Sequence, residues 1–138
     1  MALVRKGTYK PEVARSLIAL ARPRRTLGEV VQATELVLEA LDLSSKFGRK
    51  LGVAFALEEL AAMCAVQGDG LQAAMLFGAA HALREGMGAP LPPVDRAAHD
   101  SVVAVCRAQL GETASAEAWA HAAARPWQEV VEDILKVR

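Results

Sequence analysis

The spacing of apolar residues along the chain predicts amphipathic helices. Apolar side chains recur at a 3.6-residue period at positions 53, 57, 60, 61 and 64, and again at positions 73, 76, 77, 80 and 83. Gly68 and Gly88 follow these two stretches, and glycine often ends a helix because it adopts the left-handed conformation easily. Asp69 comes directly after the first of these stops, where its side chain can cap the next helix.

The helical pattern repeats with a period of 40 residues. Residues 13–48 and 53–88 align without a gap and share 12 identities in 36 positions. The identities include both glycines and a glutamine: Gly28/Gly68, Gly48/Gly88 and Gln32/Gln72. Each unit therefore reads as a helix, a glycine, a second helix and a second glycine, over about residues 11–48 and 51–88.

Prolines place the remaining boundaries. The insertion "GAPLPPVDR" ends one helix at about residues 86–88 and starts the next near residues 94–95, opening a degenerate third unit over about residues 94–124. Pro126 suits the first turn of a last helix over about residues 126–136, which we expect to cap the apolar end of the array. Pro23 interrupts the first unit, so we expect its first helix to end or kink near Arg22.

Composition agrees with an all-α protein of one domain, residues 1–138. Hydrophobic residues form 53% of the chain and aromatic residues only 4%, a mixture of small and aliphatic side chains that suits close helix packing. The formal net charge is zero, which makes nucleic acid an unlikely partner class for this segment. Residues 1–25 nevertheless carry seven basic side chains against one acidic side chain, and this end could meet an acidic partner. The alternative is a solvated charged face.

The sequence gives no sign of a membrane, a metal site, a cofactor or a catalytic site. No run of 18 apolar residues occurs, so we expect a soluble protein. Cys64 and Cys106 lack the spacing of a zinc site or a disulfide framework, so we expect packed thiols in a reducing cytoplasm. The three histidines fall on three different predicted helices and lack second ligands at the same-face spacing, apart from Glu85 beside His81. Glu58 and Glu59 point about 100° apart on a helix and cannot share one acid–base site.

Small residues inside the units resemble those of the tetratricopeptide repeat. Ala21 and Ala61 each lie 12 positions before a second alanine, which lies 7 positions before a third, giving the sets Ala21/Ala33/Ala40 and Ala61/Ala73/Ala80. In that family such residues mark where helices cross closely. The resemblance implies TPR-like antiparallel hairpins, about seven helices in all, stacked as a right-handed array.

A longer string, "GDGLQAAMLFGAAHALREGMGAPLPPVDR", with the later "LGETASAEAWAHA", is similar to the C-terminal helical-repeat segment of LuxR-type and AfsR-like bacterial signalling ATPases. The resemblance implies a sensing or partner-binding arm of a transcriptional regulator. The chain has no G-x-x-x-x-G-K-[ST] loop, so the ATPase activity of that family is not implied here.

If the tetratricopeptide register holds, the first helix of each unit lines a concave groove. The residues we expect to be exposed there and to bind a partner are Arg15, Arg22, Arg25, Phe55 and Glu58, with Ile18 and Ala62 between them. Arginines seven residues apart share a helical face and could hold an acidic peptide beside Phe55. The alternative is that Glu58 pairs with Arg15 or Arg22 across neighbouring helices.

We therefore expect a non-catalytic protein-interaction or sensing module whose partner is a protein or peptide, with an acidic one as the candidate that the basic residues suggest. A homodimer through the first hairpin would cover the other end of the array. The alternative functions are a small helical ligand-binding bundle or enzyme, or a nucleic-acid-binding helical domain.

Overall fold

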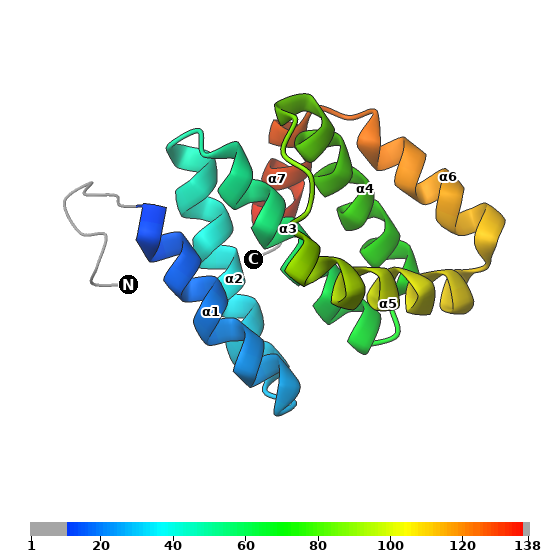
Figure 1. The fold of residues 1–138 in the computed structure, drawn as a ribbon, viewed down its shortest axis with the longest axis horizontal. Helices are drawn as coiled ribbons and strands as arrows, with labels where there is room; N and C mark the ends of the chain where they lie inside the picture. The colour runs from blue at the N-terminus through cyan, green and yellow to red at the C-terminus, as the bar shows by residue number, and fades with distance from the viewer. Residues whose placement is uncertain (1–10, 137–138) are drawn as a thin grey trace.

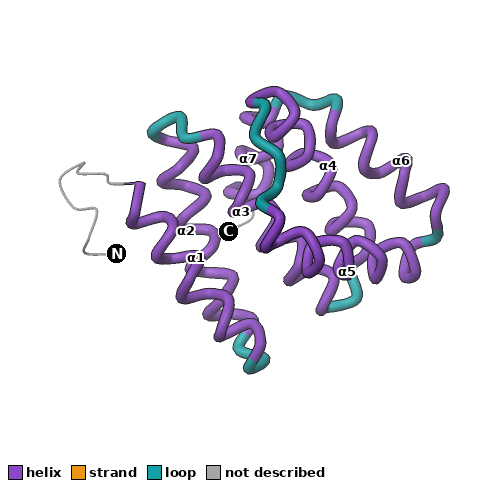
Figure 2. Tube along the Cα trace, in the orientation of Figure 1, coloured by secondary structure: helices purple, strands orange, loops and turns teal. Residues whose placement is uncertain are grey.

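A computed structural model describes residues 11–136 of the chain, and this part consists of helices joined by short loops (Figures 1 and 2). The seven helices in the described residues are α1 (Pro11–Thr26), α2 (Val30–Lys46), α3 (Lys50–Val66), α4 (Gly70–Met87), α5 (Pro93–Leu110), α6 (Glu112–Ala123) and α7 (Trp127–Lys136). The predicted all-α class with seven helices is confirmed. No helix in residues 11–136 is both long and apolar enough to span a membrane.

The 40-residue repeat appears as two helical hairpins, α1 with α2 and α3 with α4. Gly68 and Gly88 end α3 and α4 with φ angles of 83° and 62°, so the predicted glycine stops are confirmed. The Asp69 cap is confirmed too, because its Oδ1 accepts a hydrogen bond from the Gln72 backbone N–H at 3.1 Å.

Small residues lie where helices cross, as the spacing predicts. Ala33 and Ala73 are fully buried at matching positions of α2 and α4, and Ala40 and Ala80 are buried one repeat apart in the same way. The closest approach involves Gly78 of α4, where an added Cβ would lie 2.9 Å from the backbone carbonyl carbon of Trp119 in α6. A side chain at Gly78 would therefore push α6 away from α4.

The third unit departs from the expected hairpin. Only Gly111 separates α5 from α6, and α6 packs chiefly along α4 and only slightly against α5 (Figure 1). Ala104 and Ala116, which align with the buried Ala61 and Ala73, are exposed. The third unit thus keeps the helix boundaries of the repeat but does not pack as a hairpin. The tetratricopeptide-like stacking of the array remains a prediction.

We expected the first helix to end or kink near Arg22, and the first alternative is wrong, because α1 continues through Pro23 to Thr26. A proline in the last turn of a helix removes only one backbone hydrogen bond. Tertiary contacts hold the turn in place, since Arg22 and Arg25, on either side of the proline, both donate to Glu59 of α3.

The last helix has the predicted amphipathic character and a different position. Val130 and Val131 are buried, Trp127 and Ile134 pack against the core, and the acidic residues between them are exposed. However, α7 folds back against α2 and α4, behind α3 in the view of Figure 1, and does not cover the end of the array at α6. It therefore braces the second helices of the two hairpins together.

Candidate functional site

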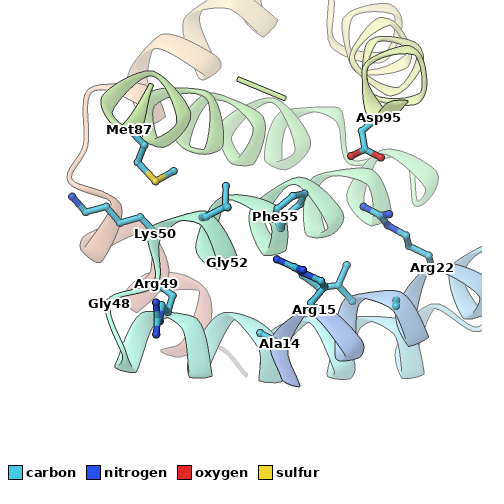
Figure 3. Close-up of a pocket in the computed structure, with 13 residues that line it drawn as sticks. Ala14, Arg15, Arg22, Gly48, Arg49, Lys50, Gly52, Phe55, Met87 and Asp95 are labelled. Carbon is cyan, nitrogen blue, oxygen red and sulfur yellow. The ribbon is translucent and has the colours of Figure 1, made fainter. Parts of the chain in front are cut away.

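A groove of about 630 Å³ runs between α1 and the first turns of α3 (Figure 3). One wall is formed by α1 and the other by residues 48–52 and Phe55 of α3. Met87 at the end of α4 and Asp95 in α5 also line it. The groove exists because α1 and α3 are corresponding helices of neighbouring hairpins, whose contact is less extensive than the contacts within each hairpin.

The rim of the groove is positively charged. Arg15, Arg22, Arg49 and Lys50 line it, and Asp95 is the one acidic side chain among its described lining residues. Arg15, Arg49 and Lys50 are exposed and make no ion pair with any side chain in the described part of the chain. An anion in the groove would therefore meet three cations that are not paired with a carboxylate, with Asp95 as the one opposing charge among the described lining residues.

The N-terminus of α3 adds to the positive electrostatic potential of the groove. Arg49 is its N-cap and makes no side-chain capping hydrogen bond, and the first turn contains no acidic residue. The free backbone N–H groups of a helix N-terminus carry partial positive charge, which an Asp or Glu normally offsets. At α3, that charge faces the same groove as Arg49 and Lys50.

Apolar side chains form the floor of the groove. Ile18 is buried, Phe55 and Met87 are half-buried, and Leu51 is 41% exposed. The exposure of Leu51 and Phe55 leaves apolar area that a partner could cover. The groove thus combines a cationic rim with an apolar floor.

Of the five predicted binding residues, Arg15, Arg22 and Phe55 line this groove. Arg22 is also engaged internally, because its Nε donates to Oε1 of Glu59 at 2.6 Å, and Arg25 donates to Oε2 of the same residue at 3.2 Å. Glu59 is only 7% exposed. The prediction of one free arginine stripe is therefore wrong, since Arg22 and Arg25 anchor α1 to α3 and Arg15 alone has no acidic partner among the described residues.

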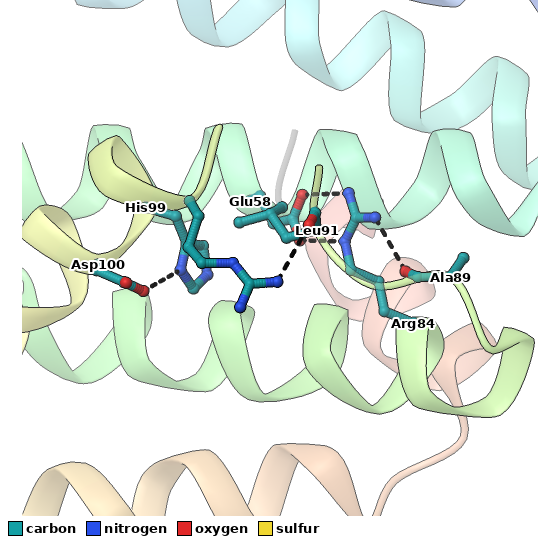
Figure 4. A network of polar contacts seen from close by, with 7 residues as sticks. Glu58, Arg84, Ala89, Leu91, His99 and Asp100 are labelled. Carbon is teal, nitrogen blue, oxygen red and sulfur yellow. Dashed lines mark hydrogen bonds and ion pairs between the residues drawn. The ribbon is translucent and has the colours of Figure 1, made fainter. Parts of the chain in front are cut away.

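Glu58 does not face the arginines of α1, and its expected pairing with Arg15 or Arg22 is wrong. It accepts two hydrogen bonds from Arg84 of α4, at 2.6 Å and 2.9 Å, and Arg84 also donates to the Ala89 carbonyl at 3.2 Å (Figure 4). The Arg84 guanidinium lies 4.8 Å from the centre of the Phe55 ring. This largely buried pair joins α3 to α4, and Glu58 does not line the groove between α1 and α3.

Two further exposed positions were expected on the concave face. Ile18 and Ala62 are instead 7% and 6% exposed, so the expectation that they are exposed is wrong. The cationic residues Arg49 and Lys50 were not predicted as site residues. Their position just after the Gly48 stop, at the start of a helix without a cap, was the available signal.

The two cysteines are free thiols, Cys64 half-buried and Cys106 buried. Burial raises the pKa of the Cys64 thiol to about 11, with smaller contributions from Asp69 and Cys106, and burial also raises the pKa of Cys106. Both thiols therefore stay protonated at neutral pH and are poor nucleophiles. No cluster of three or more metal-ligating side chains occurs within residues 11–136.

Comparison with known proteins gives no relative from which to identify the chain: no family model matches it, and no curated protein or solved structure is significantly similar to it. The groove and its side chains therefore carry the functional argument.

Proposed function

We propose that the protein is a non-catalytic interaction module that binds an acidic, partly apolar peptide segment of another protein in the groove between α1 and α3. The observation that carries the proposal is the combination of three unpaired cationic side chains, Arg15, Arg49 and Lys50, with an exposed apolar floor at Leu51 and Phe55. Carboxylates of the partner would meet the rim, and a large apolar side chain would cover the floor.

The resemblance of residues 68–119 to the helical-repeat segment of bacterial signalling regulators agrees with such a role. In our proposal the module is the partner-binding arm of a regulator of that kind. The tetratricopeptide-like register supports the same idea, because α1 and α3 would be the helices that line its concave face.

The test uses immobilised peptides of about twelve residues with apolar side chains at i, i+3, i+4 and i+7. One set carries Asp and Glu at the remaining positions, and the other carries Lys and Arg there. We expect binding to the acidic set alone, weakening as salt rises because exposed charges are screened within about 10 Å at 0.1 M ionic strength.

The decisive variant is Arg15→Glu combined with Lys50→Glu. Both side chains are exposed and make no ion pair with a described residue, so the variant should fold with a stability within about 0.5 kcal/mol of the parent and lose the acidic peptides. Arg22→Glu is unsuitable, because it would bring a second carboxylate against the buried Glu59. Arg107→Glu is the matched control, since Arg107 is equally exposed and lies outside the groove.

Equal binding of acidic and basic peptides, or full binding by the double variant, would contradict the proposal. Double-stranded DNA serves as the competing ligand, since the same cations could contact phosphates without reading sequence. Tighter binding to DNA than to every acidic peptide would replace the proposed partner by nucleic acid.

A further inference from the structure

A second cleft lies between α4, α5 and α6, and it shares no lining residue with the groove. It has a volume of about 610 Å³, within the usual range for small-molecule sites. Its lining residues come from α3, α4, the loop of residues 88–91, α5 and α6, so its shape depends on the unusual packing of α6 along α4.

Aromatic rings form one side of this cleft. Trp119 of α6 is half-buried and stacks on Phe77 of α4 with ring centres 6.3 Å apart. His81 lies 5.6 Å from Trp119, and His99 of α5 meets the edge of Phe77 at 5.0 Å. Trp119, His81 and His99 all line the cleft, which gives a planar ligand rings against which to stack.

The carboxylates that line the cleft each contact a basic or imidazole side chain of the same cleft. Three carboxylates line it, and each has a partner: Glu58 with Arg84, Glu85 with His81, and Asp100 with His99. Figure 4 shows the first and last of these pairs beside the loop at Leu91.

Two further arginines of the cleft, Arg96 and Arg107, are not part of these pairs. Both line the cleft from α5, and neither makes an ion pair with a side chain in the described residues; Arg96 contacts only the Leu91 carbonyl, at 3.4 Å. They are eleven residues apart on one face of α5, or about 16 Å along the helix axis, so a compact anion would reach only one of them.

We infer that this cleft binds a small planar aromatic acid, with the ring against Trp119 and His81 and the carboxylate or phosphate on Arg96 or Arg107. Arg96 and Arg107, which have no ion-pair partner among the described residues, favour an anionic group on the ligand. The rings of Trp119 and His81 favour a flat ligand, because such a ligand can stack against them. This site is separate from the groove between α1 and α3 and does not depend on its proposed role.

The test is calorimetric titration of the full chain with 2-naphthoate, 2-naphthyl phosphate and the neutral analogue 2-naphthamide. We expect binding of at least one acid and at least about fivefold weaker binding of the amide, because the charged hydrogen bond to an arginine is lost. The acid that binds more tightly shows whether the cleft prefers a carboxylate or a phosphate group. Absence of measurable binding by both acids, or equal binding of acid and amide, would overturn the inference.

Substitutions then locate the ligand. Either Arg96→Gln or Arg107→Gln should weaken binding of the acid about fivefold or more, whereas Arg49→Gln, in the other groove, should leave it unchanged. Full binding by both cleft variants would show that the acid sits elsewhere. Melting temperatures equal to that of the parent would establish that each variant is folded.

A spectroscopic measurement gives independent support. The chain has two tryptophans, and Trp127 lies on α7 outside the cleft. In ¹⁵N-labelled protein, the acid should shift the indole N–H resonance of Trp119 and leave that of Trp127 in place, with Trp127→Phe providing the assignment. A shift confined to Trp127 would overturn the inference.

Discussion

The Nε atom of Arg22 lies 2.6 Å from the Oε1 atom of Glu59, which joins the last turn of α1 to the middle of α3. Glu59 also accepts from Arg25, while its neighbour Glu58 points about 100° away around α3 and pairs with Arg84 of α4. Adjacent carboxylates thus tie α3 to two different helices. The arginines that the sequence marks for a partner are largely used to hold the scaffold that presents the groove.

Glu59→Gln should lower the free energy of unfolding by about 1 to 3 kcal/mol, because two arginines lose a buried charged acceptor. Urea denaturation followed by circular dichroism measures the change. Glu117→Gln, at an exposed position of α6 without a recorded ion pair, is the control and should stay within about 0.5 kcal/mol of the parent. Equal stability of Glu59→Gln and the parent would mean that the two ion pairs are not formed in solution.

Gly78→Ala should destabilise the protein by about 1 to 3 kcal/mol, because the added Cβ would lie 2.9 Å from the Trp119 carbonyl carbon and force α6 off α4. Gly86→Ala in the same helix is a matched control with nothing within 4 Å of the added Cβ. It should raise stability by about 0.5 to 1 kcal/mol, since alanine loses less entropy in a helix. The contact between α4 and α6 would be looser than described if both variants gained stability.

Ala73→Leu should overpack the crossing of α4 with its neighbours and cost about 1 to 3 kcal/mol, because Ala73 is fully buried. Ala116→Leu is its counterpart in the third unit, where the alanine is exposed, and should have little effect. Thermal melting of both variants gives the comparison. An unchanged melting temperature for Ala73→Leu would reject the repeat register.

Removal of residues 126–138 should uncover apolar surface of α2 and α4 and cause aggregation or loss of cooperative melting. The point variant Val131→Asp should have a milder effect in the same direction, because Val131 is only 2% exposed. Light scattering and calorimetry distinguish aggregation from loss of cooperativity. A truncated protein as stable as the parent would show that α7 is dispensable.

Asp133 of α7 accepts a hydrogen bond of 2.6 Å from Arg125, which lowers the pKa of the Asp133 carboxyl. A lowered pKa means that the contribution to stability is present at neutral pH and is lost as the pH falls through the folded-state pKa. The melting temperature of Asp133→Asn should therefore lie below that of the parent at neutral pH and approach it in acid. A difference that persists in strong acid would assign the effect of the substitution to packing.

The sequence by itself determined the helices and most of their boundaries, the end of α1 excepted, because these depend mainly on local properties. The 3.6-residue apolar period, the Asp69 cap and the left-handed Gly68 and Gly88 act within a few residues, and the 40-residue repeat placed two matching hairpins. The burial of Ala73 and Ala80 also followed, since small residues at matching positions mark close crossings.

Only the tertiary structure decided which helices meet outside the two hairpins and which charges pair. The sequence pattern places Glu58 and Glu59 about 100° apart on their helix. It does not set how α3 is rotated relative to α1 and α4. That rotation decides that Glu59 pairs with Arg22 and Glu58 with Arg84. The placement of α6 along α4 and of α7 against α2 and α4 likewise depends on which apolar surfaces remain uncovered after the hairpins form. An amphipathic helix specifies that one face must be buried, and the shape of the rest of the fold selects the surface that buries it.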